Sequence, residues 1–527
     1  MVGVKSRTLI TALSLAVSLA VGSAQAQDLK IGVRAGPEAM DPHYMALGHQ
    51  IAAIKNIYEA LVTFDENLQI APGLAESWKP INDTTWEFTL RPNVKFHNGE
   101  PLTAEDVKFS LDRVPGAAGP DGGLVINTRN ITHVEVTGPL TVQVTTSVAN
   151  PALPQDLARV SILPHSIGKA TVEDFNSGKA AIGTGPFKFA GFKARTGFDV
   201  TRNDDYWGGK ADWDKVSFTE ISNDAARVAA LLSKRVDVVN YVPFSDVEKM
   251  RRNRDVSVVQ GQSIYVFLLY PDQRAHSDLV TDKAGKPLDV NPLSKPQVRE
   301  ALSLAIDRTA IADRALEGFA KPANQLIDDK FFGALPTPPK LEYNVAKARR
   351  LLADAGYPDG FKLPLHCTSD RFPGDGATCT ALGQMFARIG IDTQVNALSR
   401  TVFVPARTRG DYIMTMAGWG SVSGEAGYTL SSIAHTNDKS KGLGAFNVSH
   451  VSNPKSDELI ATAMRTLDND QRKQLFQQAM TSTLDNYDII PVVQLSSVWA
   501  SRANTVTFTP RVDEETLPFF IHPAAKK

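Results

Sequence analysis

The chain is poor in cysteine and in net charge. Its 527 residues include two cysteines, and 56 basic side chains nearly balance 57 acidic ones. Two cysteines exclude a disulfide-rich small scaffold, and the balanced charge excludes the concentrated basic face that duplex nucleic acid requires. A hydrophobic content of 43% excludes intrinsic disorder. The length predicts about two to four folded domains with cores of their own.

Long apolar runs are also lacking, apart from one segment at the N-terminus. Lys5 and Arg7 precede an apolar stretch of 13 residues at 9–21, and an A-x-A site follows at 24–26. This pattern predicts a secretory signal peptide over residues 1–26. The stretch is shorter than the roughly 20 residues that span a bilayer. No cysteine follows the cleavage site to carry a lipid, so we expect an unanchored exported protein, most simply in a periplasm.

Export would place the two cysteines in an oxidising compartment. Cys367 and Cys379 lie 12 positions apart. An oxidising compartment favours a disulfide between two such thiols. The alternative is a zinc pair, but no Cys or His cluster completes four ligands. The sequence therefore favours a disulfide over a metal site.

Strand and helix periodicities alternate along the chain, as is typical of a mixed α/β protein. Alternating apolar residues predict a strand at 86–90. They also predict two hairpins, one pairing 134–136 with 142–144 and one pairing 187–189 with 198–200.

Three helices carry start or stop signals. Thr103 with Asp106 is expected to open one helix, and Ser294 with Gln297 predicts a capping box at the start of another. Asn344 is expected to cap a third helix, which should end at Gly356.

Motifs of catalysis are not found. The Gly-x-Gly pairs at 183–185 and 442–444 lack the third glycine of a dinucleotide fingerprint, and Val422 stands where a hydrolase elbow needs serine. His43 and His49 are six positions apart, which does not suit a helical metal pair. The sequence therefore predicts neither an enzyme nor a metal site.

A series of ordered blocks carries a resemblance to a known family. The chain closely resembles the family 5 solute-binding proteins of bacterial ABC importers, the peptide-, nickel- and opine-binding group. The matching blocks lie at 58–62, 72–78, 86–90, 94–99, 103–107, 183–187, 203–207, 298–302 and 346–358. One departure is Lys234, where relatives commonly place a helix-ending glycine.

The resemblance implies an α/β architecture: a two-lobed periplasmic-binding-protein fold (type II, large form) with an extra inserted domain. The expected divisions, after the signal peptide at 1–26, are lobe I at 27–65, 185–267 and 490–527, the inserted small domain at 66–184, and lobe II at 268–489. The expected hinge lies where the chain crosses near Tyr265 and near 492–497.

The resemblance also suggests where a ligand binds. Trp419 matches the binding-cleft tryptophan of the family. Peptide binders place an aspartate three residues later to meet the ligand's ammonium, and this chain has Val422 there. A buried ammonium needs a counter-charge. Glu425, six residues past Trp419, is the candidate substitute, with an exposed loop glutamate as the alternative.

Four further residues complete the predicted site. Arg371, between the two cysteines, has a planar guanidinium that suits a ligand carboxylate, with a surface ion pair as the alternative. Tyr265, and Met45 with its neighbour Tyr44, are weaker candidates for an apolar wall.

These observations predict a periplasmic substrate-binding protein of an ABC importer, monomeric and without catalytic residue, cofactor or metal. Its expected partners are a small solute, most simply a peptide or peptide-like compound, and an inner-membrane permease with its ATPase. The alternatives are a non-peptide solute such as an opine or sugar derivative, with metal or haem less favoured. From another class, the alternatives are an exported hydrolase or chaperone.

Overall fold

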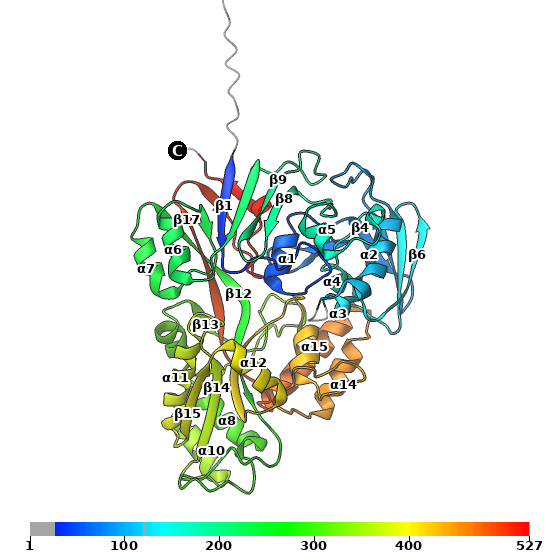
Figure 1. Ribbon diagram of the computed structural model, residues 1–527. Coiled ribbons are helices and arrows are strands. Elements are labelled where there is room, and N and C mark those ends of the chain that lie inside the picture. The colour runs from blue at the N-terminus through cyan, green and yellow to red at the C-terminus, as the bar shows by residue number, and fades with distance from the viewer. Residues whose placement is uncertain (1–26, 120–122, 526–527) are drawn as a thin grey trace, which may run out of the picture.

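The computed structural model describes residues 27–119 and 123–525, so the predicted signal peptide lies outside the described residues. Two lobes lie one above the other and share one large sheet, and a smaller domain packs beside the upper lobe (Figure 1). This is the mixed α/β, two-lobed arrangement that the sequence predicts.

The shared sheet has eleven strands, and its order shows how the chain connects the lobes. The order is β15-β14-β16-β12-β17-β11-β1-β10-β9-β8, with β13 pairing β17. In that order the strands span Asp392–Leu398, Lys362–Thr368, Met414–Gly420, Val256–Pro271, Ile490–Arg502, Val238–Val239, Asp28–Val33, Lys215–Glu220, Gly197–Arg202 and Phe187–Lys193, and β13 spans Ala320–Pro322.

Two long antiparallel strands pass from one lobe to the other. β12 has 16 residues and β17 has 13, and they pair with each other from Val256↔Arg502 to Leu269↔Ile490. The register shifts between Gln262 and Val266. Such a shift bends and twists a strand pair locally. The bend therefore lies beside Tyr265, in the segment where the family resemblance places the hinge.

The side domain has its own four-stranded antiparallel sheet in the order β4-β5-β7-β6. Its strands span Ala75–Pro80, Thr85–Leu90, Thr141–Thr146 and Ile131–Gly138, and its helices α2 to α5 span Ala104–Ala117, Val125–Thr128, Leu153–Leu157 and Val172–Asn176. A two-stranded ribbon, β2 (Val62–Phe64) with β3 (Ile70–Pro72), leads into it.

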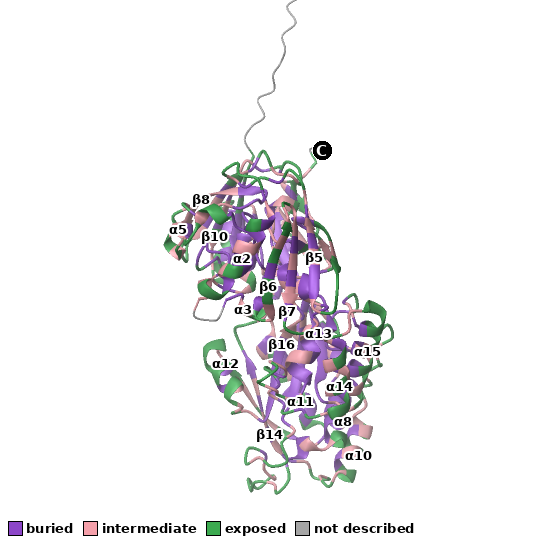
Figure 2. Cartoon of the chain, turned by 90° about the vertical axis from the view of Figure 1, so that its right-hand side faces the viewer, coloured by how far each residue is buried: buried purple, intermediate pink, exposed green. Residues whose placement is uncertain are grey.

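Helices cover both faces of the large sheet, and buried residues concentrate along its strands (Figure 2). The upper lobe carries α1 (Gly48–Ile54), α6 (Asp224–Leu232), α7 (Phe244–Arg251) and the terminal ribbon of β18 (Val506–Phe508) with β19 (Ile521–Pro523). The lower lobe carries α8 (Pro296–Ala305), α9 (Arg308–Ala310), α10 (Val345–Asp354), α11 (Asp375–Ala387), α12 (Arg400–Arg409), α13 (Ala426–Thr429), α14 (Pro454–Ala463) and α15 (Asn469–Asp485).

Most of the local predictions are confirmed. Both hairpins form, as β6 with β7 and β8 with β9. The N–H of Thr103 donates to Asp106 at 2.8 Å. Asn344 caps α10 by accepting from the N–H of Lys347 at 2.9 Å. Lys234 itself adopts the left-handed conformation, with φ of 62°, where glycine would be usual.

One capping prediction is wrong. The structure starts α8 at Pro296 with Lys295 as its N-cap, and no side chain caps it. The hydroxyl of Ser294 instead donates to the carbonyl of Asn291 at 2.7 Å. The reason is the turn at 292–294, in which Ser294 belongs to a short 3-10 helix that precedes α8.

Two blocks of the family resemblance meet in the fold. Glu59 accepts a hydrogen bond from the hydroxyl of Tyr206 at 2.8 Å and one from the indole N–H of Trp207 at 2.9 Å. Burial raises the pKa of Glu59 to about 7, although these donors oppose the rise. The blocks at 58–62 and 203–207 are therefore joined by a polar contact just before the chain enters the β2–β3 ribbon that leads to the side domain.

Candidate ligand-binding site

A cavity of about 380 Å³ lies between the two lobes, beside the bend in β12 and β17. Its walls come from the loop after β1, the start of α1, the hinge strands, the loop after β14, and the segment after β18; they include residues 33–36, 47–49, 240–242, 370–373, 495–498 and 513–516. This volume is in the range of about 300–1,000 Å³ that is typical of small-molecule sites. The cavity is thus large enough for a small solute and is placed where lobe movement would close it.

The lower lobe contributes an arginine with no charged partner. Arg371 lines the cavity from the loop after β14, and its guanidinium makes no hydrogen bond or ion pair within the described part of the chain. Its backbone is fixed, because Asp375 accepts from the N–H groups of both Arg371 and Phe372 at 3.2 Å. The loop therefore holds a free guanidinium at the cavity on a rigid support.

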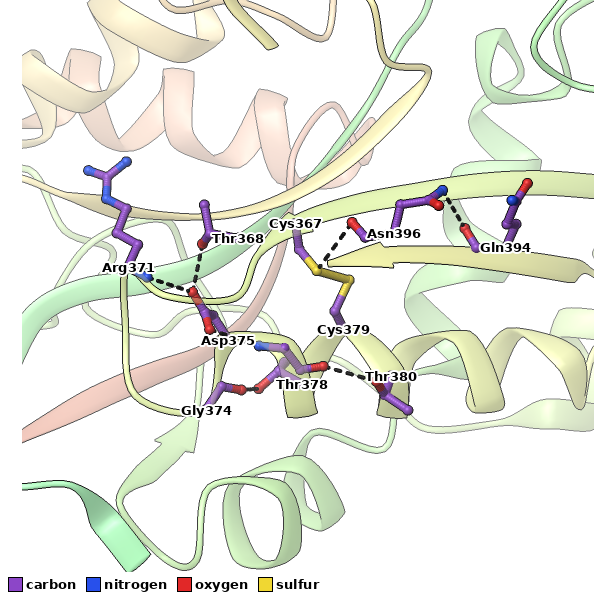
Figure 3. Close-up of a disulfide and its surroundings, with 11 residues drawn as sticks. Cys367, Thr368, Arg371, Gly374, Asp375, Thr378, Cys379, Thr380, Gln394 and Asn396 are labelled. Carbon is purple, nitrogen blue, oxygen red and sulfur yellow. Dashed lines mark hydrogen bonds between the residues drawn. A yellow bond between two sulfur atoms is a disulfide. The ribbon is translucent and has the colours of Figure 1, made fainter. Parts of the chain in front are cut away.

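A disulfide stabilises this loop. Cys367 and Cys379 are bonded, with their Cα atoms 6.5 Å apart. The bond joins β14 to α11, and the loop that carries Arg371 lies between the two cysteines (Figure 3). Thr368 donates to Asp375 at 2.7 Å in the same segment. The cysteines thus serve the geometry of the loop rather than a metal site.

Aromatic rings form the wall next to this arginine. Tyr265 lies against Phe372 with ring centroids 4.8 Å apart. A side chain at Gly418 would meet the Phe372 ring, since a Cβ built there lies 2.6 Å from it. Glycine in β16 is therefore required for Phe372 to pack in this position. Tyr265 and Phe372, with their rings tilted by 56° to each other, together supply an aromatic wall for a ligand.

The upper lobe contributes a buried carboxylate. Glu514 is 9% exposed and accepts hydrogen bonds from the hydroxyls of Ser263 and Ser497 on one oxygen. Its other oxygen accepts from the hydroxyl of Tyr241 at 2.8 Å. Burial raises the pKa of Tyr265 to about 12, and among nearby charges Glu514 adds to the rise while Arg371 opposes it. Tyr265 is therefore within electrostatic range of both the carboxylate of the upper lobe and the guanidinium of the lower lobe.

One arginine joins the two lobes across the cavity. Arg34, just after β1, donates from Nη2 to the carbonyl oxygen of Asp370 at 3.1 Å and from Nη1 to that of Arg371 at 3.5 Å. Its own N–H donates to Asn240 at 3.0 Å. Arg34 thus contacts the loop that carries Arg371 directly.

The comparisons with known proteins identify the family and the fold. The family model described as bacterial extracellular solute-binding proteins, family 5 Middle, matches residues 69–441. The chain belongs to this family. The glutathione-binding protein GsiB of Salmonella paratyphi A (strain ATCC 9150 / SARB42) is 28% identical to this family 5 protein over 520 residues, which cover 95% of each chain.

Solved structures show the same fold. HbpA2 from Haemophilus parasuis has a TM-score of 0.79 at 24% identity, with 94% of this chain and 100% of that chain covered. AgaA from A. tumefacien R10, solved in complex with agropinic acid, has a TM-score of 0.72 at 25% identity, with 95% and 99% covered. The family 5 protein therefore has the two-lobed type II periplasmic-binding fold.

The structure brings together only part of the site predicted from sequence. Arg371 and Tyr265 both line the cavity of the family 5 protein, whereas Trp419, Glu425 and Met45 are not among the residues that line it. Met45 is buried, with 8% of its surface exposed. The loop predicted to carry it does reach the cavity, through residues 47–49.

Trp419 belongs to a neighbouring aromatic group. Its indole N–H donates to Thr429 at 3.0 Å, and its ring stacks on Tyr428 with centroids 5.5 Å apart. Trp419 pairs with Val266 in the sheet, next to Tyr265. A direct ligand contact by Trp419 stays a prediction.

Glu425 has a cationic partner of its own. Its carboxylate pairs with the guanidinium of Arg472, and both side chains are buried. Burial raises the pKa of Glu425, and Arg472 opposes that rise. Arg472 also lies over Phe332, with 4.8 Å between the guanidinium carbon and the ring centroid. This placement argues against Glu425 as the receptor for a ligand's ammonium.

The sequence did not predict Glu514 as a site residue. The signal for it is the acidic run at 513–515, which is not distinctive among 57 acidic residues. The residues that hold its carboxylate lie near 241, 263 and 497, far from it in the sequence.

Proposed function

We propose that this family 5 protein is the substrate-binding component of an ABC importer and captures a small peptide-like solute that carries a carboxylate. The observation that supports this most directly is the unpaired guanidinium of Arg371 in the interlobe cavity. A guanidinium binds a carboxylate through two parallel hydrogen bonds. The captured solute would then pass to an inner-membrane permease and its ATPase.

The relatives favour the same chemical class. GsiB is named for glutathione, a tripeptide with free carboxylates, and AgaA was solved with agropinic acid. A peptide-like acid is therefore the first candidate. A non-peptide acid such as an opine is the second, because the family 5 protein has Val422 in place of the ammonium-binding aspartate of peptide binders.

Export to the periplasm is part of the proposal. In residues 27–119 and 123–525, no helix combines the length and the apolar character needed to cross a bilayer. We expect cleavage after residue 26. The intact mass of the protein purified from the periplasm should show loss of those residues, and retention of the full chain would contradict this.

Capture would work by closing the lobes. Binding that bridges both walls stabilises the closed arrangement and excludes water from the cavity. Arg34 is placed to support this state because it reaches from the upper lobe to the carbonyls of Asp370 and Arg371 in the lower lobe. No catalytic step is part of the proposal.

Calorimetric titration with a defined panel tests the proposed ligand class. The panel contains glutathione, di- to tetrapeptides, the same peptides with C-terminal amides, opines and neutral sugars. We expect binding of peptides with a free carboxylate and at least a tenfold loss on amidation, as for a charge-assisted hydrogen bond of about 1.5–3 kcal/mol. Native mass spectrometry of freshly purified protein should show a co-purified acid of this kind.

Variants connect the result to the cavity. Arg371→Ala should weaken binding about 10- to 100-fold, with Arg371→Lys between the two. Arg409→Ala is the matched control, because that exposed arginine of α12 pairs with Asp411 on the outer surface. Equal binding of acids and amides, or unchanged affinity in Arg371→Ala, would refute the proposed carboxylate site.

A further inference from the structure

Three consecutive acidic residues enter the upper wall of the cavity, and they differ in their partners. Asp513 pairs with Arg511 at 2.7 Å, and Glu515 pairs with Lys55 at 2.8 Å. Glu514, between them, has no basic side chain within ion-pair distance in the described ranges. Its partners are three hydroxyl groups, so no basic side chain neutralises the carboxylate; burial raises the pKa of Glu514, and these three donors oppose the rise.

The burial of Glu514 and its remaining capacity to accept hydrogen bonds indicate a ligand-binding role. A buried carboxylate without a cation is costly, and such groups are normally paired or placed to bind something. Three donors occupy part of its acceptor capacity of about four lone-pair sites. Glu514 lines the cavity, so the remaining capacity is available to a ligand.

The backbone adds an independent observation. Glu514 has φ of 65° and Tyr241 has φ of 50°, both in the left-handed region that residues other than glycine rarely adopt. The two residues are hydrogen-bonded to each other through their side chains and both line the cavity. Strained residues that persist together at a cavity are typical of functional sites.

The opposite charge lines the same cavity from the lower lobe, in the side chain of Arg371. Asp370 is the other cavity carboxylate without a basic partner, but it is exposed to water and its side chain accepts from the N–H of Arg400. A cationic group entering the cavity therefore gains most from Glu514, which is already removed from water.

We propose that Glu514 binds a cationic nitrogen of the solute, so that the cleft takes zwitterions whose ammonium meets Glu514 on the upper lobe and whose carboxylate meets Arg371 on the lower lobe. This inference rests on the proposed function and narrows its substrate class. The counter-charge for the ligand's ammonium then comes from the segment after β18. Val422 cannot supply it because valine is uncharged, and Glu425 cannot because its carboxylate already pairs with Arg472.

The test compares free and blocked amines on the wild type and on Glu514→Gln. The probes are glutathione and tripeptides, their N-acetyl derivatives, and mannityl amino acids whose nitrogen is a secondary ammonium. We expect acetylation to weaken binding to the wild type at least 30-fold. In Glu514→Gln the ratio between acetylated and free probes should fall to about threefold or less. Glu248→Gln, an exposed carboxylate of α7 paired with Arg251, is the control and should keep the wild-type ratio.

The ratio separates a binding role from a structural one. A Glu514→Gln variant that weakens free and acetylated probes equally, or leaves the ratio at the wild-type value, would overturn the proposal. If only the mannityl amino acids bind, and Glu514→Gln weakens them at least 30-fold, the inference stands while the peptide-like class fails. If peptides bind with no effect of acetylation, the proposed function stands and the inference fails. A panel without any binder would contradict both.

Discussion

The buried pair of Glu425 and Arg472 allows a sharp test of structural against ligand-binding roles. Glu425 is 4% exposed and Arg472 is 2% exposed. Beyond their mutual contact, Glu425 Oε1 and Arg472 Nε have no hydrogen-bond partner among the described residues. Replacing one partner therefore leaves an ion in the core with little compensation. We expect Arg472→Met to lower the free energy of unfolding by about 3–5 kcal/mol.

The double replacement should recover most of that loss. Arg472 lies over the rings of Phe332 and Phe476, at 4.8 Å and 5.4 Å from their centroids. A methionine sulfur packs well against such rings. Glu425→Leu combined with Arg472→Met removes both charges, and we expect it to lie within about 1 kcal/mol of the wild type, because apolar replacement of a buried pair is often neutral.

The pH dependence gives a second readout of the same pair. Burial already raises the pKa of Glu425, and removal of Arg472 takes away the group that opposes the rise. The folded Arg472→Met variant therefore binds a proton more tightly than its unfolded chain does. Its deficit in stability should be largest near neutral pH and should shrink as the pH falls toward 5, because protonation removes the buried charge.

Urea unfolding followed by tryptophan fluorescence and circular dichroism measures these differences, and calorimetry measures ligand affinity. We expect the affinity of Glu425→Leu with Arg472→Met to stay within about twofold of the wild type. The reasoning is refuted if Arg472→Met unfolds like the wild type, or if the double variant is stable but does not bind ligand. The second result would show that Glu425 contacts the solute.

Three further predictions follow from the described contacts. Because the pKa of Glu59 is about 7 in the folded protein, against about 4.5 ordinarily, the folded state holds the proton more tightly. The contribution of Glu59 to the free energy of unfolding is therefore fully present below pH 4.5, and it falls by up to about 1.4 kcal/mol per pH unit as the pH rises toward 7. Glu59→Gln should consequently reduce the dependence of the thermal midpoint on pH between pH 5 and 8. Replacing Cys367 and Cys379 with serine should lower the free energy of unfolding in urea by about 2–3 kcal/mol. A variant as stable as the wild type would contradict a stabilising role for the disulfide. Arg34→Ala removes the bond to the carbonyl of Asp370, so small-angle scattering should show a larger radius of gyration for the unliganded protein; an unchanged radius would rule out Arg34 as a lobe contact in solution.

Local elements were predictable where short-range chemistry decides them. The cap at Asn344 depends on a backbone N–H three residues away, and the hairpin of β6 and β7 depends on alternation around a tight turn. The cap at Ser294 failed because a 3-10 turn begins first and uses the same hydroxyl. The two-lobed fold came from the family resemblance, since no local pattern specifies the order of eleven strands.

The site was predictable only where one segment carries it. Arg371 follows β14 in a loop whose neighbours in the sequence, Cys367 and Asp375, hold it in place. The environments of Glu425 and Glu514 depend on residues far away in the chain, so the sequence could not show that one is paired and the other is not. Arg472, which neutralises Glu425, is 47 positions away.

The position of β17 has a consequence for the order in which the protein assembles. β17 is the last long strand in the described part of the chain, yet it lies between β12 and β11 near the middle of the large sheet. Until residues 490–502 are present, β12 and β11 have unpaired edges, and the two halves of the sheet have no strand joining them. Such pairings between distant segments form slowly, and until they form the unpaired strand edges can associate with other chains. A chain interrupted before residue 490 therefore cannot complete this sheet, because β17 is the strand that hydrogen-bonds its two halves to each other.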